Sequence, residues 1–309
     1  PVLNKDDPTS RHCAPLLGAF SIPSPFFTWT IRLVPTQVTQ TIFLNKPMPS
    51  PKPSFLRLLL LAFLINILTQ AIHETGHLLA YQAYGRNPTW GFIGLVQRWN
   101  TPPEHPEGWV QTSTPDGEIG WLRLDALPTE TSEIAIIGAA GPLASLCFAF
   151  LGLYWAYRYK HDEGVFKYIA LMLALSTSLV MGLYYLRSPL RTIGDEYDIA
   201  TYFGLAKSWV EIPLGLAFIT CFGLGVRWLS SWRERGVWFV ACFLGSVSAG
   251  ILLTVFDGWV REGVNQGIPF VQPFLGVSLP VLIVDALAVL GIILMFNLRK
   301  VVKASTQTG

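Results

Sequence analysis

Six long apolar stretches constrain the fold of this chain more than any other feature of its sequence. A helix that crosses a hydrocarbon core of about 30 Å needs roughly 20 consecutive apolar residues, and each stretch reaches that length. The chain is 51% hydrophobic and only 14% charged, which is too apolar for a typical soluble domain. We therefore predict an all-α polytopic membrane protein, a multi-pass integral protein with about six transmembrane helices. The expected spans are Phe55 to Tyr84, Ile134 to Tyr157, Val165 to Leu186, Trp209 to Leu229, Val237 to Phe256 and Leu275 to Leu298.

The formal net charge of +2 gives no electrostatic reason to expect a nucleic-acid partner. The four cysteines form no C-x-x-C pair, and three of them fall inside apolar stretches, where cysteine behaves as a small hydrophobic residue. Composition therefore predicts the lipid bilayer as a partner, no nucleic acid and no disulfide framework.

A metal-binding pattern, His73-Glu74-Thr75-Gly76-His77, occurs near the end of the first apolar stretch. Histidines four residues apart lie on one face of a helix, so both imidazoles can bind a single Zn²⁺ ion, with Glu74 beside them. The alternative is a pair of surface histidines on an ordinary helix. Ionisable residues at membrane depth are costly and face a cavity, a protein interior or a metal, which favours the metal site.

A catalytic zinc site takes three protein ligands, so one more donor must come from elsewhere in the chain. Asp195 is the strongest candidate, because it follows an extended, proline-containing segment and begins a helix, although an N-cap role would also suit it. Asp198, one helical turn later, is its nearest alternative. Three weaker candidates are Asp116, which is most simply a turn residue, Asp257 at the end of the fifth stretch, and Asp285 within the sixth.

The segment between the first two spans has a different composition, with aromatic and polar residues interleaved. Gly108 to Ser113 and Ile119 to Leu124, joined by a turn at Thr114 to Gly117, predict a small β-hairpin insertion. The second span contains the small-residue stretch Gly138 to Ser145, which allows another helix to approach closely.

Three features, in this order, resemble the site-2 protease family of intramembrane zinc metalloproteases. They are His73 to His77, the stretch Gly138 to Ser145, and Leu186-x-x-Pro189 leading to Asp195. The resemblance covers about half of the chain.

The resemblance implies that His73, His77 and Asp195 hold the zinc ion and that Glu74 is the catalytic carboxylate. This chain departs from the family pattern at three positions. Ser145 and Leu186 stand where the family commonly has Asn, and Glu196 stands where Gly usually follows the aspartate ligand. These departures concern contacts to the substrate more than the metal ligands.

Residues 1–53 are rich in proline and contain no apolar stretch long enough to span a bilayer, which predicts a disordered arm. The resemblance implies a metalloprotease core with three spans at 54–205, and a C-terminal three-span bundle follows at 206–309. The implied function is zinc-dependent hydrolysis of a peptide bond in a transmembrane segment of a single-span membrane protein. The alternative is a non-proteolytic membrane scaffold or binding protein that keeps the same fold and metal site.

Two other zinc-binding classes fit less well. A protease of prenylated proteins would use a glutamate as third ligand, but Glu130 and Glu133 lie in a polar linker without a second motif. A metal transporter would carry ligands on several spans. The orientation in the membrane stays open, because the positive-inside rule places both termini in the cytoplasm and the family arrangement implies the opposite.

Overall fold

The computed structural model describes residues 53–95, 98–99, 107–113, 119–160, 164–187 and 194–307. The expected arm at 1–53 therefore lies outside the described residues apart from Pro53. The same holds for the turn at Thr114 to Gly117, which includes Asp116, and for Pro189 in the segment before Asp195.

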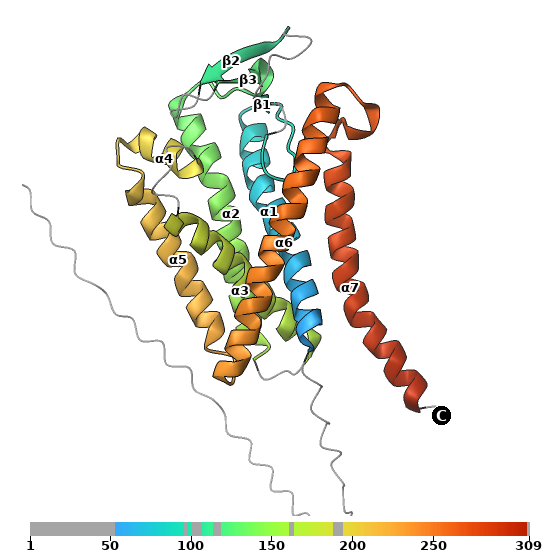
Figure 1. Ribbon diagram of the computed structural model, residues 1–309. Helices are drawn as coiled ribbons and strands as arrows, with labels where there is room; N and C mark the ends of the chain where they lie inside the picture. The colour runs from blue at the N-terminus through green and yellow to red at the C-terminus, as the bar shows by residue number, and fades with distance from the viewer. Residues whose placement is uncertain are drawn as a thin grey trace, which may run out of the picture. The chain divides into compact units, whose positions relative to one another are not determined.

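Six helices in the described part of the chain are long and apolar enough to cross a membrane (Figure 1). The predicted fold class is confirmed: the chain is a helical, multi-pass integral membrane protein. The six helices are α1 (Phe55–Ala83), α2 (Thr131–Arg158), α3 (Val165–Arg187), α5 (Ser208–Val226), α6 (Trp232–Asn265) and α7 (Leu279–Gln307). A shorter helix, α4 (Asp195–Phe203), connects α3 to α5.

Local signals set the ends of α1. The Ser54 side chain accepts a hydrogen bond from the backbone N–H of Arg57, which caps the first turn. At the other end Gly85 has a φ of 70°, a left-handed conformation that glycine adopts without steric cost. Pro88 follows shortly after, and the helix cannot continue.

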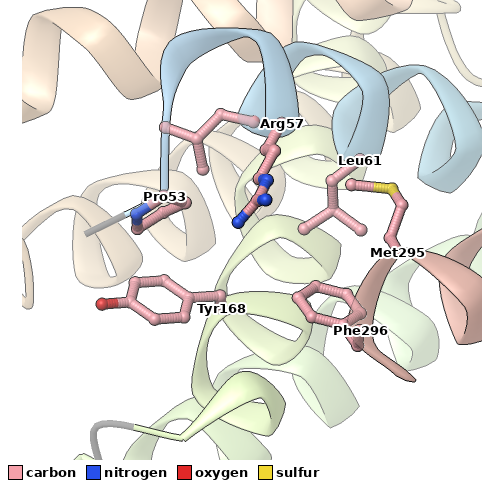
Figure 2. Close-up of a pocket in the computed structure, with 7 residues that line it drawn as sticks. Pro53, Arg57, Leu61, Tyr168, Met295 and Phe296 are labelled. Atoms are coloured by element: carbon pink, nitrogen blue, oxygen red, sulfur yellow. The ribbon is translucent and has the colours of Figure 1, made fainter. Parts of the chain in front are cut away.

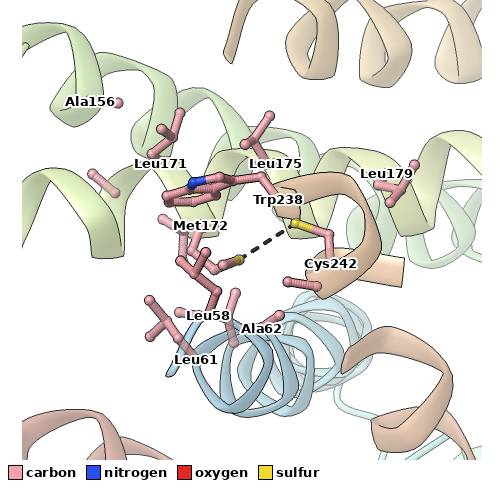
Figure 3. Close-up of a cluster of buried hydrophobic side chains, with 14 of the residues drawn as sticks. Leu58, Leu61, Ala62, Ala156, Leu171, Met172, Leu175, Leu179, Trp238 and Cys242 are labelled. Atoms are coloured by element: carbon pink, nitrogen blue, oxygen red, sulfur yellow. Dashed lines mark hydrogen bonds between the residues drawn. The ribbon is translucent and has the colours of Figure 1, made fainter. Parts of the chain in front are cut away.

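Helix α1 packs against α2, α3, α6 and α7, so it is the central element of the described bundle. Leu58, Leu61 and Ala62 of α1 lie in a buried cluster whose other members come largely from α3 and α6 (Figure 3). In this cluster the Cys242 thiol lies 3.5 Å from the sulfur of Met172. Helices α6 and α7 from the C-terminal segment thus pack directly against α1, the helix that carries His73 and His77.

Buried polar pairs fix the position of α1 against α3. Asn66 donates to the Ser176 hydroxyl at 2.6 Å, and the hydroxyls of Thr69 and Thr177 lie 2.8 Å apart. Interhelical hydrogen bonds of this kind help to hold helices together in a membrane. Apolar side chains gain little there by leaving lipid for protein, because the lipid tails are equally apolar. Both pairs lie one to two turns before His73 on α1.

The predicted hairpin between the first two spans is confirmed. Strand β2 (Trp109–Ser113) pairs antiparallel with β3 (Ile119–Arg123), with Trp109 opposite Arg123. A third strand, β1 (Arg98–Trp99), pairs with the other edge of β3 and was not predicted. A short 3₁₀ helix, η1 (Leu124–Ala126), leads from the sheet toward α2.

Two predicted boundaries near the C-terminus are wrong. Helix α6 does not end at Phe256 but continues through Asp257 to Asn265. The last span begins at Leu279 rather than Leu275. A 3₁₀ turn, η3 (Pro269–Val271), and a hairpin of β4 (Pro273–Phe274) and β5 (Val277–Ser278) precede it, and hydropathy alone does not separate such a hairpin from a helix.

Candidate metal centre

Three side chains from two helices bring their donor atoms together. The Nε2 atoms of His73 and His77 lie 3.2 Å apart, and each is 3.3 Å from Oδ2 of Asp195. The exposed fractions of the three side chains are 12%, 5% and 30% in that order, so the group is largely shielded from the surroundings. This is the one such group of histidine, cysteine or acidic side chains among the described residues that could hold a metal ion.

The spacing of these atoms fits a small tetrahedral ion. Ligands bound about 2.0–2.2 Å from zinc at tetrahedral angles lie roughly 3.3–3.5 Å from one another. The observed separations of 3.2 and 3.3 Å are close to that value on all three sides. The donor set of two imidazoles and one carboxylate also suits a catalytic zinc ion, which keeps a fourth position for water or substrate.

Helix α2 orients both histidine rings. Nδ1 of His77 donates to the carbonyl oxygen of Ile137 at 2.7 Å, and Nδ1 of His73 lies 3.1 Å from the hydroxyl oxygen of Ser145. A proton on Nδ1 leaves the lone pair of Nε2 available for a metal. The Ile137 carbonyl can only accept, so it selects this tautomer of His77, while the Ser145 hydroxyl orients the His73 ring. From the sequence, Ser145 is expected to affect contacts to the substrate. In the structure its hydroxyl instead contacts His73, a predicted metal ligand.

Glycines allow α1, α2 and α4 to approach closely at the site. A Cβ added to Gly141 would lie 2.1 Å from Nε2 of His77, and one added to Gly76 would lie 2.5 Å from the carbonyl oxygen of Ala140. A Cβ on Gly138 would lie 2.8 Å from the carbonyl oxygen of Asp195. The small-residue stretch of α2 therefore provides the close approach that its sequence predicts, and it does so around the metal-binding side chains.

Asp195 is the first residue of α4, directly after Gly194, whose φ of 126° is a conformation that glycine favours. Burial alone would raise the pKa of this carboxyl group. The adjacent imidazoles of His77 and His73 outweigh that effect and hold the pKa of Asp195 below its ordinary value. The lowered pKa favours the ionised carboxylate, which is the form that binds a metal.

Asp198, the nearest alternative to Asp195, does not join the group of donor atoms. Burial and the negative charges of Asp195 and Glu196 raise the pKa of Asp198 to about 7. Its carboxyl group is therefore partly protonated near neutral pH, which suits a metal ligand poorly.

The weaker candidates lie elsewhere in the described bundle or outside it. Asp257 on α6 accepts hydrogen bonds from the backbone N–H groups of Phe92 and Ile93. Asp285 lies on α7, and Asp116 is outside the described residues. Neither Asp257 nor Asp285 is among the three donors that come together.

The two glutamates considered for a different zinc protease are structural. Both carboxylate oxygens of Glu133 accept hydrogen bonds from the Arg86 guanidinium at 2.9 Å. This contact ties the residues after α1 to the start of α2. Glu130 and Glu133 also form a capping box at the start of α2.

The predicted catalytic carboxylate, Glu74, lines the same cavity as the three donors. The Gln70 amide donates to Oε1 of Glu74 at 2.6 Å and holds the carboxylate in place. Gln70 was not identified from the sequence, although its position four residues before Glu74 on the same helix face was a usable signal.

The cavity has a volume of about 320 Å³, and its walls come from four parts of the chain: α1, the loop after it, α3 and the start of α4. The indole of Trp90 stacks on the His77 imidazole with 5.5 Å between ring centroids. Six of the wall residues were not predicted, because they follow α1 in irregular structure or lie on α3 away from any recognised motif. They are Trp90, Ile93, Gly94, Val180, Met181 and Tyr184.

A second pocket lies at the start of α1 between α3 and α7 (Figure 2). Its volume of about 10 Å³ holds roughly one water molecule, so it is not comparable to the metal cavity. The lining residues are Pro53, Arg57, Leu58, Leu61, Tyr168, Met295 and Phe296.

No protein-family model, no curated protein and no solved structure matches this chain.

Proposed function

We propose that this protein is an intramembrane zinc metalloprotease that hydrolyses a peptide bond in a transmembrane segment of a single-span membrane protein. The observation that carries the proposal is the meeting of His73, His77 and Asp195 beside Glu74 in one cavity. His73 and His77 lie roughly 9–15 Å along the axis from the C-terminal end of α1, inside a helix that is long enough to span the bilayer. Ionisable side chains at such a depth cost free energy, so their presence there points to a functional site.

The proposed cofactor is Zn²⁺, held by Nε2 of His73, Nε2 of His77 and Oδ2 of Asp195. When bound, zinc lowers the pKa of water to about 7 and polarises a carbonyl group. The protein's own contribution is to fix the His77 tautomer through the Ile137 carbonyl and to orient the His73 ring through the Ser145 hydroxyl.

Glu74 is the proposed general base and acid. Since Gln70 occupies Oε1, the second oxygen, Oε2, is placed to accept a proton from the attacking water. The water oxygen bonds to the scissile carbonyl carbon, the carbon–nitrogen bond breaks, and Glu74 returns the proton to the departing amine nitrogen. The substrate helix must unwind locally before its peptide bond can enter the cavity, because helical backbone groups are already hydrogen-bonded.

The substitution Glu74→Gln tests this proposal directly. It keeps the size of the side chain and the contact with Gln70 but removes the proton acceptor, so we expect cleavage of a single-span substrate to fall roughly 100- to 10,000-fold. Zinc content of the purified protein should stay at the wild-type level. Asp195→Asn should lower zinc content, while Asp285→Asn, a carboxylate change on α7, serves as the matched control with zinc retained.

Equal turnover by wild type and Glu74→Gln would rule out proteolysis by this mechanism. A wild-type protein that binds zinc but cleaves no single-span substrate would instead favour the alternative, a membrane scaffold or binding protein with the same metal site.

A further inference from the structure

Part of the cavity wall is a loop that follows α1. Trp90, Ile93 and Gly94 line the cavity from this loop. The loop has little structure of its own: a hydrogen bond from the Gly91 N–H to the Gly94 carbonyl oxygen, at 2.9 Å, closes a tight turn. Gly94 has a φ of 127°, which a residue with a side chain rarely adopts.

The backbone of this loop is tied to the segment between α6 and α7. The Trp90 N–H donates to the carbonyl oxygen of Gly276 at 2.9 Å, and the Ser278 N–H donates to the carbonyl oxygen of Trp90 at 3.2 Å. These residues belong to the β4–β5 hairpin and its turn. The loop beside the histidines is therefore paired with a hairpin almost 190 residues later in the chain.

A carboxylate on α6 completes the attachment. Oδ1 of Asp257 accepts hydrogen bonds from the backbone N–H groups of Phe92 at 2.9 Å and Ile93 at 3.3 Å. Its other oxygen, Oδ2, accepts from Nε of Arg261 at 2.6 Å. Asp257 and Phe92 are 5% and 3% exposed, so these bonds are shielded from water and each is costly to lose.

We propose that Asp257 is a positioning residue for the cavity beside the candidate metal donors: through the backbone of Phe92 and Ile93, it holds the loop 90–94 against the cavity and so fixes the space that receives the substrate. The effect on substrate rests on the proposed proteolytic function, whereas the attachment itself does not. The proposal also gives the C-terminal segment a role, because the carboxylate lies on α6 and the paired β4–β5 hairpin follows α6.

The position of the loop matters because its residues contact the site at two points. Trp90 stacks on His77, and the side chain of Ile93 lies on the cavity wall next to the backbone that Asp257 holds. Asp257 touches none of the three metal donors. Its loss should therefore weaken substrate binding and leave metal binding intact.

Hydrogen–deuterium exchange of the purified, zinc-loaded, full-length protein tests the attachment. In Asp257→Ala we expect the amides of Phe92 and Ile93 to exchange roughly tenfold faster or more, since each loses a buried hydrogen bond to a charged acceptor. Asp257→Asn keeps one acceptor oxygen and should fall between Ala and wild type, and it decides the question if the Ala variant does not fold. Asp285→Asn removes a carboxylate from α7 without touching the loop and should leave these amides unchanged.

Cleavage kinetics test the consequence for the substrate. We expect Asp257→Asn to raise KM roughly tenfold with kcat within about twofold of wild type, as for a change that weakens binding without altering the chemical step. Wild-type exchange rates at Phe92 and Ile93 in both Asp257 variants would overturn the proposal. So would faster exchange spread evenly over α1 and α6, which would show a general loss of stability. If wild type cleaves nothing, the proposed function fails while the exchange experiment still decides the attachment.

Discussion

Gly141 lies where any larger side chain would meet Nε2 of His77, one of the three candidate metal donors. The added Cβ of an alanine would be 2.1 Å from Nε2, a separation that real atoms do not tolerate. Because α2 also holds the other ring nitrogen of His77 through the Ile137 carbonyl, the ring cannot move away without breaking that hydrogen bond. The requirement for glycine thus comes from the site as well as from helix packing.

We therefore expect Gly141→Ala to reduce zinc affinity by about tenfold to 100-fold, the range seen when contacts that orient a ligand are lost. The measurement is zinc affinity by competition with a chelator of known strength. Gly250→Ala on α6 is the control, since a Cβ there meets nothing within 4 Å. Unchanged zinc affinity in Gly141→Ala would mean that His77 does not bind the metal through Nε2.

The residues of the site differ in how far the sequence alone predicts them. His73, Glu74 and His77 are predictable because their spacing on one helix already defines their relation in space. Asp195 required a choice among carboxylates, and its position follows from contacts between helices. Trp90 carries no such signal, because its proximity to His77 depends on how the chain turns after α1.

Helix α4, which presents Asp195, is held to α5 by a buried charge cluster. Lys207, just before α5, contacts Oε1 of Glu196 at 3.0 Å and Oε1 of Glu211 at 3.1 Å. Both glutamates are fully buried, and Lys207 is 11% exposed. The cluster gives Glu196 a structural role, because its side chain links α4, which carries Asp195, to α5.

Removing the lysine should be more harmful than removing one of the two carboxylates. We expect Lys207→Met to lower the free energy of unfolding by about 3–5 kcal/mol, because it leaves two buried carboxylates without this cation. Glu211→Gln leaves Lys207 and Glu196 in contact, so we expect it to lower the free energy of unfolding clearly less. Thermal or denaturant unfolding in detergent provides the measurement, and a larger loss in Glu211→Gln than in Lys207→Met would contradict this account.

The number and place of the spans were predictable, because length and apolarity decide which segments cross a bilayer. The errors occur where polar or turn-forming residues have a tertiary partner. Asp257 looked like the end of a helix, but Arg261 and the loop at Phe92 satisfy its charge and the helix continues. Leu275 looked like the start of one, yet it has a φ of 54° in the β4–β5 turn.

The whole bundle is organised around α1, and the metal donors connect parts of it that are far apart in the sequence. His73 and His77 belong to α1, Asp195 belongs to α4, and α2 lies against both. The histidine-bearing segment and the C-terminal segment are also joined, through α6 and the β4–β5 hairpin. A metal ion at the donors would therefore add a link between α1 and α4 that the packing of α2 alone does not supply.

Removal of zinc should consequently destabilise the protein in a localised way. An ion that binds only the folded state at 100 times its Kd adds about 2.7 kcal/mol, so a chelator should lower Tm measurably and zinc should restore it. In exchange experiments we expect chelation to expose amides of α4 and of α1 around His73, while the apolar centre of α7 is unaffected. The control is a variant with both His73→Ala and His77→Ala, which should show no change in Tm with either treatment. A zinc-dependent Tm in that variant would place the stabilising metal at a different site, and the link between α1 and α4 would then rest on side-chain packing.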